Sequence, residues 1–306
     1  MRDLEPLGAG QSFGLLCIGV AALGLMTVRP MVSHAKSRTP RVLLLTHNTF
    51  YNHSNLEAIE AVLPDLGKAA GFTVTSLEGY KQTRSCTTQK PCAPDVADLS
   101  MVTHQYLKQF DAIVASTNGE LPFTDEGKQA LVDFVRKDGK GIVFIHQSMV
   151  TLYGYRPWGE LLGAYMGAGA LFDGTNTSKR PGVMKVEDRT HPASRNLPEH
   201  WTLDDEFYQF AKTVGVPGPT KVPVPMAFDR KNVHVLVSFD SERTNFDGAP
   251  KEWARGGDYP QVWYQTFGKG RTFYTAIGHR EDLWRSDATY RTFITGAVRW
   301  ALHLEK

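Results

Sequence analysis

The chain has 306 residues, of which 42% are hydrophobic and 22% are charged, and its formal net charge is +2. This composition is that of an ordinary globular protein, long enough for one large domain or two small ones. No basic stripe with interleaved aromatic residues is present, which argues against a nucleic-acid partner. No period of self-similarity is visible either, so repeat architectures are set aside.

The N-terminal region carries a nearly unbroken apolar run over residues 13–28, which ends at Arg29. This run is shorter than the ~20 residues that a membrane-spanning helix needs. It suits the hydrophobic part of a secretory signal, and Ser33 and Ala35 offer small residues at the usual cleavage positions. We therefore predict that residues 1–35 are a signal peptide and that the protein is periplasmic or secreted. An uncleaved N-terminal membrane anchor is the alternative.

The cysteines agree with export. Cys17 lies inside the apolar run, which leaves Cys86 and Cys92 in a polar segment without periodicity. Two cysteines spaced in this way in a secreted chain can close a small disulfide loop. Two unpaired surface thiols are the alternative, and metal binding is less favoured because no second Cys/His pair lies nearby. An oxidising compartment favours the disulfide.

The first half of the remaining chain alternates between strand and helix patterns. After a basic linker at 36–40, apolar residues predict a strand at 42–46, and residues from Leu56 to Leu66 then recur at helical spacing behind Ser54 as N-cap. Further strands are predicted at 72–77, 111–116 and 141–145, with a short helix near 106–110 and a longer one from Thr124 to Gly139. This alternation with short links predicts a parallel sheet that has helices on both faces.

The second half is less regular and richer in strand patterns. A helix is predicted at 158–166, a glycine-rich loop at 167–181, strands at 183–186, 233–239, 261–267 and 271–277, and a closing helix at 289–302. The loop at 268–270 predicts a β-hairpin between the last two strands. Because no convincing linker is visible, we expect residues 41–304 to form one elaborated domain.

Three of the apolar strand patterns end on a histidine, namely His47, His146 and His279. In an open α/β sheet, ligands bind in the crevice beyond the carboxyl ends of the parallel strands, so these imidazoles can converge. His146 follows its strand at the corner where some α/β enzymes place a nucleophile, but the Gly-x-Ser-x-Gly pattern and an equivalent cysteine are absent. Covalent acyl transfer is thus disfavoured. His146 is either an acid–base, hydrogen-bonding or metal-binding group, or a core histidine bonded to a backbone carbonyl.

An acidic run at 204–206 is followed by aromatic residues that include Phe207 and Tyr208. The aromatic residues indicate a partly buried setting, in which a carboxylate has to be paired and its pKa can move into a useful range. Because successive residues of an extended segment face opposite ways, Asp205 and Glu206 are expected to have different roles.

His53, His191 and Trp284 give weaker signals. His53 lies just after the first strand, at the mouth of the predicted crevice, whereas His191 can be a loop histidine without function. Trp284 follows His279 in an aromatic-rich segment that would suit the faces of a sugar, although core packing is the commoner role of such residues.

Several segments, in the same order, resemble the ThuA-like (trehalose utilisation) family. They are 118–125, 134–146, His191-Pro192, Asp205-Glu-Phe-Tyr208 and 268–279, and the resemblance covers residues 41–302. That family is similar in fold to the class I glutamine amidotransferases, which implies a doubly wound, mostly parallel, flavodoxin-like sheet. In this comparison His146 takes the place of the catalytic cysteine, so glutaminase activity is not expected.

The resemblance also implies a set of site residues. The family's polar cluster maps to His53, His146, Glu206 and His279, with Asp205 and Tyr208 adjacent and with Glu120, Arg280 and Trp284 as further candidates for binding substrate. Members of the family often carry another His-Pro after the helix near 158–165, where this chain has Gly-Ala-Gly-Ala-Leu at 167–171. This departure puts a metal site using that histidine in doubt and points to a shifted substrate.

Trehalose and related disaccharides, at the level of 3-keto sugars, are the substrates that the resemblance implies. We therefore expect an exported keto-sugar isomerase, lyase or hydrolase in which His146 and His279 handle protons and Glu206 is the base. There are two alternatives. One is a metal-dependent hydrolase in which His53, His146, His279 and Glu206 hold zinc. The other is a non-catalytic carbohydrate-binding protein. The expected partner is a small carbohydrate, membrane contact is expected through the N-terminal segment alone, and formation of a homo-oligomer is left open.

Overall fold

The computed structural model describes residues 38–51, 53, 55–79, 98–167, 181–247, 249 and 252–305. The predicted signal segment and both loop cysteines, Cys86 and Cys92, lie outside these residues, so the export and disulfide predictions stay predictions. Ser54, the expected N-cap, lies outside them as well. Within the described part of the chain, no helix is long and apolar enough to cross a membrane.

The half of the sheet that was predicted to be parallel is parallel. Its five strands are β2, β1, β3, β4 and β9, in that spatial order, and each pairs in parallel with its neighbour. Their bounds are Arg41–Thr46 for β1, Thr73–Glu78 for β2, Ala112–Ala115 for β3, Gly141–Ile145 for β4 and Gly270–Thr275 for β9. β1, β3 and β4 are apolar at nearly every position, as suits strands that helices cover on both faces.

Four antiparallel strands extend the sheet beyond β9, in the order β8, β7, β5 and β6. They span Pro260–Phe267 for β8, His234–Phe239 for β7, Gly182–Val186 for β5 and His200–Leu203 for β6. The predicted hairpin is therefore confirmed, since β8 and β9 pair across Gly268 and Lys269. The short edge strand β6 was not predicted.

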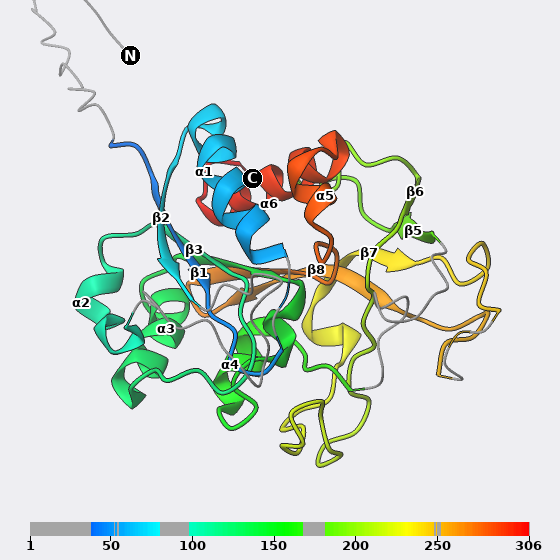
Figure 1. The fold of residues 1–306 in the computed structure, drawn as a ribbon, viewed down its shortest axis with the longest axis horizontal. Helices are drawn as coiled ribbons and strands as arrows, with labels where there is room; N and C mark the ends of the chain where they lie inside the picture. The colour runs from blue at the N-terminus through cyan, green and yellow to red at the C-terminus, as the bar shows by residue number, and fades with distance from the viewer. Residues whose placement is uncertain are drawn as a thin grey trace, which may run out of the picture. The chain divides into compact units, whose positions relative to one another are not determined.

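Helices form a layer on each side of the sheet (Figure 1). One layer holds α1 (Asn55–Ala70), α5 (Glu281–Arg285) and α6 (Ala288–Ala301), and the other holds α2 (His104–Leu107), α3 (Asp125–Arg136) and α4 (Arg156–Leu162). Alternate residues of each strand supply the two cores: Val42 packs under the α1–α6 layer and Leu43 under the α3–α4 layer. The sequence-based fold class is confirmed.

Helix α4 ends four residues before the predicted boundary, at Leu162. The reason is Gly163, which adopts a left-handed conformation with φ of 92° and whose amide bonds the Gly159 carbonyl. Any larger residue would be strained there, because a Cβ atom would also lie 2.8 Å from the Trp263 indole nitrogen. The apolar residues after Gly163 are buried in irregular backbone, which explains why their pattern looked helical.

His191 lies in the loop between β5 and β6, and it is buried among aromatic rings, 4.9 Å from Tyr264 and 4.8 Å from Trp300. Its Nδ1 accepts the Ala193 amide, so in the neutral ring the proton is on Nε2, which has no hydrogen-bond partner among the described residues. Burial lowers the pKa of His191 to about 4 from an ordinary value of 6.5. This histidine is therefore a neutral part of the core.

Because the pKa of His191 is lowered by burial, we expect the protein to lose stability in acid. Between pH 6.5 and about 4, His191 is protonated in the unfolded state but neutral in the folded state. Its contribution to the free energy of unfolding is therefore complete above pH 6.5 and decreases as the pH is lowered. The loss amounts to about 3 kcal/mol by pH 4. We expect His191→Phe, which suits the aromatic surroundings, to flatten the dependence of the free energy of unfolding on pH, measured by denaturant unfolding. An unchanged slope would contradict this account.

Candidate functional site

His146 stands at the corner between β4 and the 3₁₀ turn His146–Val150, at the carboxyl edge of the parallel strands. Its backbone has a φ of 40°, which strains a residue other than glycine, and the Tyr274 hydroxyl donates to its carbonyl oxygen at 3.1 Å. The ring is fully buried, and its Nδ1 lies 2.5 Å from the Ala276 carbonyl oxygen. Since a carbonyl can only accept, Nδ1 carries a proton and Nε2 faces the site.

Glu206 is the point at which the site converges. Its Oε2 lies 2.9 Å from His146 Nε2 and 3.2 Å from His279 Nδ1. The Tyr208 hydroxyl approaches the same oxygen at 3.2 Å and His146 Nε2 at 2.7 Å. Burial would raise the pKa of Glu206, but the hydrogen bond and charge of His146, with the charges of His279 and His53, lower it to about 2. Glu206 is therefore ionised, and polar atoms of His146, His279 and Tyr208 surround its Oε2.

Asp205, next to Glu206, faces a different way, as its place in an extended segment predicted. Its Oδ2 accepts the Gly278 amide at 2.6 Å, and its Oδ1 accepts the Arg280 amide at 3.1 Å. Burial raises the pKa of Asp205 to about 6, against the lowering influence of His146 and these amides. Asp205 thereby fixes the loop after β9 that carries His279, and it does not touch the other site side chains.

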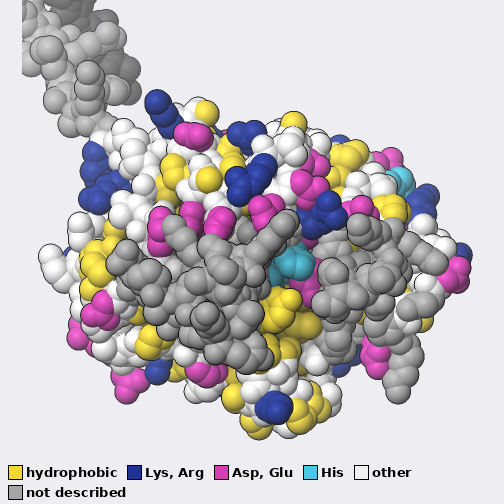
Figure 2. All heavy atoms as spheres, viewed as in Figure 1, with side chains coloured by type: hydrophobic (Ala, Val, Ile, Leu, Met, Phe, Trp, Pro, Cys, Tyr) yellow, Lys and Arg dark blue, Asp and Glu magenta, His cyan; other side chains and the backbone are white. Residues whose placement is uncertain are grey.

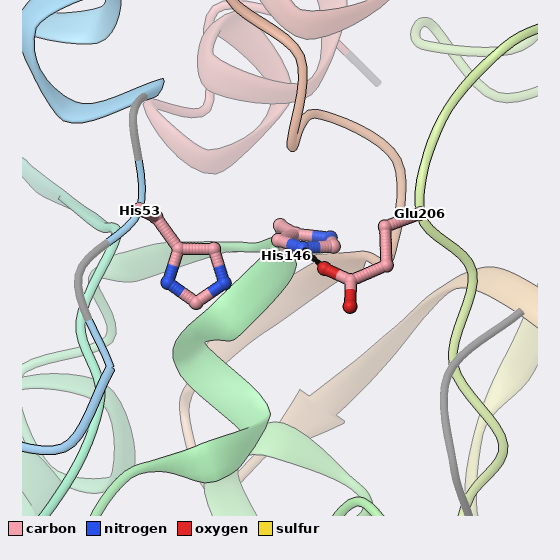
Figure 3. A group of neighbouring side chains, drawn as sticks. All are labelled: His53, His146 and Glu206. Carbon is pink, nitrogen blue, oxygen red and sulfur yellow. Dashed lines mark hydrogen bonds and ion pairs between the residues drawn. The ribbon is translucent and has the colours of Figure 1, made fainter. Parts of the chain in front are cut away.

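His53 comes from the loop between β1 and α1 and completes the cluster. Its ring lies 5.3 Å from that of His146 and 5.2 Å from that of His279, in both cases edge to face. Its Nε2 is 3.4 Å from the Tyr208 hydroxyl. Burial, reinforced by the charges of His146 and His279, lowers the pKa of His53 well below its ordinary value. Figure 3 shows His53, His146 and Glu206 pointing toward one another from three separate segments.

Asn118, which follows β3, sets the orientation and the tautomer of His53. Its Oδ1 accepts the amides of Phe50 at 3.2 Å and Tyr51 at 3.3 Å, so its Nδ2 is the group that faces His53 Nδ1 at 3.2 Å. The Tyr51 carbonyl oxygen also lies 3.3 Å from His53 Nδ1, but that oxygen already accepts from Asn118 Nδ2 at 2.5 Å. We therefore assign His53 Nδ1 as the acceptor of the second Nδ2 hydrogen, which leaves the proton of the neutral ring on Nε2. Sequence reasoning missed this role, although Asn118 begins one of the segments that resemble the ThuA-like family. Its place just after a buried strand was the available signal.

Three of the sequence-based candidates make hydrogen bonds or ion pairs with residues outside the cluster. The Trp284 indole is fully buried and donates to the Gly278 carbonyl oxygen at 3.0 Å, so it supports the loop and offers no face to a solute. The Arg280 guanidinium pairs with Asp282 at 2.7 Å. Glu120 is exposed and accepts the Gly154 amide. His47 is buried directly after the last residue of β1.

The cluster reaches the surface of the protein. On the face drawn in Figure 2, a histidine side chain is visible in a hollow, with acidic and hydrophobic side chains beside it. Of the two histidines that contact Glu206, His279 is the accessible one, with 20% of its side chain exposed against none for His146. A solute can therefore approach the site from the side of His279.

A cation is the other group that these side chains could hold. Ligand atoms of His53, His146 and Glu206 all lie within 4.8 Å of one another. The Nδ1 bond of His146 to a carbonyl is the second contact that metal-binding histidines usually make. His53 fits less well, because the donation from Asn118 leaves a proton on the Nε2 that faces the cluster.

The fold and the site define a doubly wound α/β protein with a histidine at the strand-to-helix corner. The model of the ThuA family, described as trehalose utilisation, matches residues 41–301, so the chain belongs to this family. A comparison with curated proteins finds no significant match.

Solved structures agree on the fold. A ThuA-like protein from Bacteroides uniformis is 21% identical, with a TM-score of 0.57 over 89% of this chain and 94% of that one. A second from Parabacteroides merdae is 17% identical, with a TM-score of 0.57 over 86% of this chain and 90% of that one.

Proposed function

We propose that the protein is an exported enzyme that converts a keto-sugar derived from trehalose or a related glucoside by acid–base chemistry. The observation that carries the proposal is the convergence of His146, His279 and Tyr208 on one oxygen of Glu206. Family membership in trehalose utilisation supports the carbohydrate, and the strand-end position supports a ligand site.

We assign the role of base to His279 and the role of its orienting partner to Glu206. With a pKa of about 2, Glu206 is a weak base itself, and we assign it the role of orienting and charge-stabilising partner, in place of the base expected from the sequence. His279 Nδ1 lies 3.2 Å from Glu206 Oε2, and a proton held there by the carboxylate would leave the lone pair on Nε2, as in a Ser-His-Asp triad. His279 Nε2 would then take the acidic proton beside the keto group.

His53 and Tyr208 supply the protons. The neutral Nε2–H of His53 would donate to the keto oxygen as negative charge develops there. Burial and the nearby charge of Glu206 raise the pKa of the Tyr208 hydroxyl well above its usual value, so it stays protonated and can donate to a departing oxygen. In a 3-keto-glucoside, removal of the C2 proton gives an enolate. Breaking of the C1–O bond then forms the C1=C2 double bond while Tyr208 protonates the departing glycosidic oxygen, which completes a β-elimination. Return of a proton to the opposite face of C2 would instead give the C2 epimer.

A metal-dependent hydrolase is the second candidate, and the close approach of ligand atoms from His53, His146 and Glu206 favours it. An ion there would act as a Lewis acid on the substrate oxygen. The tautomer assigned to His53, with its proton on Nε2, argues against it, which is why we place acid–base chemistry first.

The test is hydrogen exchange and turnover of 3-keto-trehalose and 3-keto-glucosides in deuterated water, followed by proton NMR. We expect loss of the C2 proton signal with the wild-type protein, and none with His279→Gln or His146→Ala. The control is His234→Gln, an exposed histidine paired with Asp188, which should match wild type. Unchanged substrate with the wild-type protein would refute the proposal. Stoichiometric metal by elemental analysis, with activity lost on chelation, would establish the second candidate instead.

A further inference from the structure

Two aromatic side chains are exposed next to the site. Phe50 and Tyr51, on the loop between β1 and α1, are 40% and 52% exposed. The other large hydrophobic residues that are exposed in the described part of the chain are aliphatic, namely Met101, Val214, Val216 and Leu304. Exposed apolar side chains that lie together can mark a ligand-binding surface, and these two are neighbours in the chain beside the site.

Hydrogen bonds anchor the backbone of Phe50 and Tyr51. Asn118, which is fully buried, accepts both the Phe50 and the Tyr51 amide, and its Nδ2 donates to the Tyr51 carbonyl oxygen at 2.5 Å. Gly119 packs so closely that a Cβ atom there would lie 2.2 Å from Thr49 Oγ1 and 2.9 Å from the Phe50 amide nitrogen. The exposure of the rings is therefore part of a fixed backbone conformation, which lowers the entropic cost of binding a ligand.

Tyr51 lies against the cluster of polar side chains around Glu206. Its ring lies 5.1 Å from that of His53 at an interplanar angle of 77°. His53 in turn contacts the rings of His146 and His279. A ligand lying on Tyr51 would thus have the polar groups of the cluster at one edge. An apolar face beside hydrogen-bonding groups matches a pyranose ring, which has C–H groups on its faces and hydroxyls around its rim.

We propose that Tyr51, with Phe50 beside it, is the platform on which a pyranose ring of the substrate stacks. This inference rests on the proposed function, because it assumes that the ligand of the site is a carbohydrate. The platform binds the ring, whereas the His279–Glu206 pair acts on it. Tyr51 is accordingly a specificity-determining residue whose loss weakens binding more than it slows the chemical step.

The experiment measures binding of trehalose by saturation-transfer NMR and titration calorimetry, and KM and kcat with 3-keto-trehalose. Removing one aromatic contact in Tyr51→Ala should weaken binding and raise KM about 5- to 10-fold, with a smaller change in kcat. Tyr51→Trp, which keeps an aromatic face, should restore the affinity. Met101→Ala, an exposed apolar residue outside this loop, is the matched control and should leave both constants as in wild type.

The outcomes separate this inference from the proposed function. Turnover that is unaffected by Tyr51→Ala would overturn the platform and leave the acid–base proposal intact. Binding of trehalose that depends on Tyr51, without turnover of any keto-sugar, would support the platform while the proposed reaction fails. A wild-type protein that binds neither trehalose nor its 3-keto derivative would overturn the platform.

Discussion

Glu206→Gln is expected to lower turnover of a 3-keto-glucoside by about 10²- to 10⁴-fold, the usual contribution of a group in an acid–base mechanism. The amide that replaces the carboxylate has no negative charge to stabilise the histidines, and it accepts at one atom only. His279 then loses the partner that fixes its tautomer. Steady-state kinetics, with thermal unfolding to verify the fold, measures the effect.

Glu120→Gln is the matched control for this experiment. It makes the same chemical change in an exposed carboxylate that accepts a hydrogen bond from the Gly154 amide. We expect its kcat and KM to stay at the wild-type values. Equal losses in the two variants would show that the carboxylate at position 206 has no special role in the reaction.

Asn118→Asp is expected to reverse the hydrogen-bonding direction of His53. The aspartate can still accept the Phe50 and Tyr51 amides, but it presents an oxygen to His53 Nδ1 where Asn118 presents a donor. The proton of His53 would move to Nδ1, and the lone pair would face the cluster. Without the donor for the keto oxygen, turnover should fall by about 10²-fold.

The same variant separates the two candidate mechanisms. A histidine that donates from Nδ1 to a carboxylate is a better metal ligand through Nε2, so a metal-dependent enzyme would gain metal affinity and keep its activity. The tautomer of His53 can be read from nitrogen chemical shifts. Because the Tyr51 carbonyl also loses its donor, we expect a loss of stability of about 1–3 kcal/mol. Asn245→Asp, which adds the same charge on the surface, is the control.

The elements of the parallel sheet could be predicted because each is encoded locally. An unbroken apolar run such as 42–46 needs cover on both faces, and the Thr124 N-cap, whose hydroxyl accepts the Gly127 amide, begins α3 as expected. The edge strand β6 has no such signature, since only Trp201 and Leu203 of its four residues are buried. Its existence depends on pairing with β5.

The sequence predicted which residues form the site better than it predicted what each of them does. His53, His146, Glu206 and His279 were candidates through the family resemblance and the strand-end pattern, and the structure brings them together. Asn118 was missed because asparagine after a strand is ordinary in a loop, and its importance lies in contacts with residues more than 60 positions away.

The sequence by itself thus determined which strands are buried, that His146 directly follows β4, and that Asp205 and Glu206 face different ways. These properties follow from periodicity along single elements. The strand predicted to end on His279 stops earlier, at Thr275, so His279 lies in the following loop. Only the tertiary structure decided that Asp205 holds the His279 loop, that Asn118 sets the proton of His53, and that the Arg280 and Trp284 side chains bond outside the cluster. Those outcomes depend on loop conformations such as the positive φ of His146, which long-range hydrogen bonds fix and which no local pattern records.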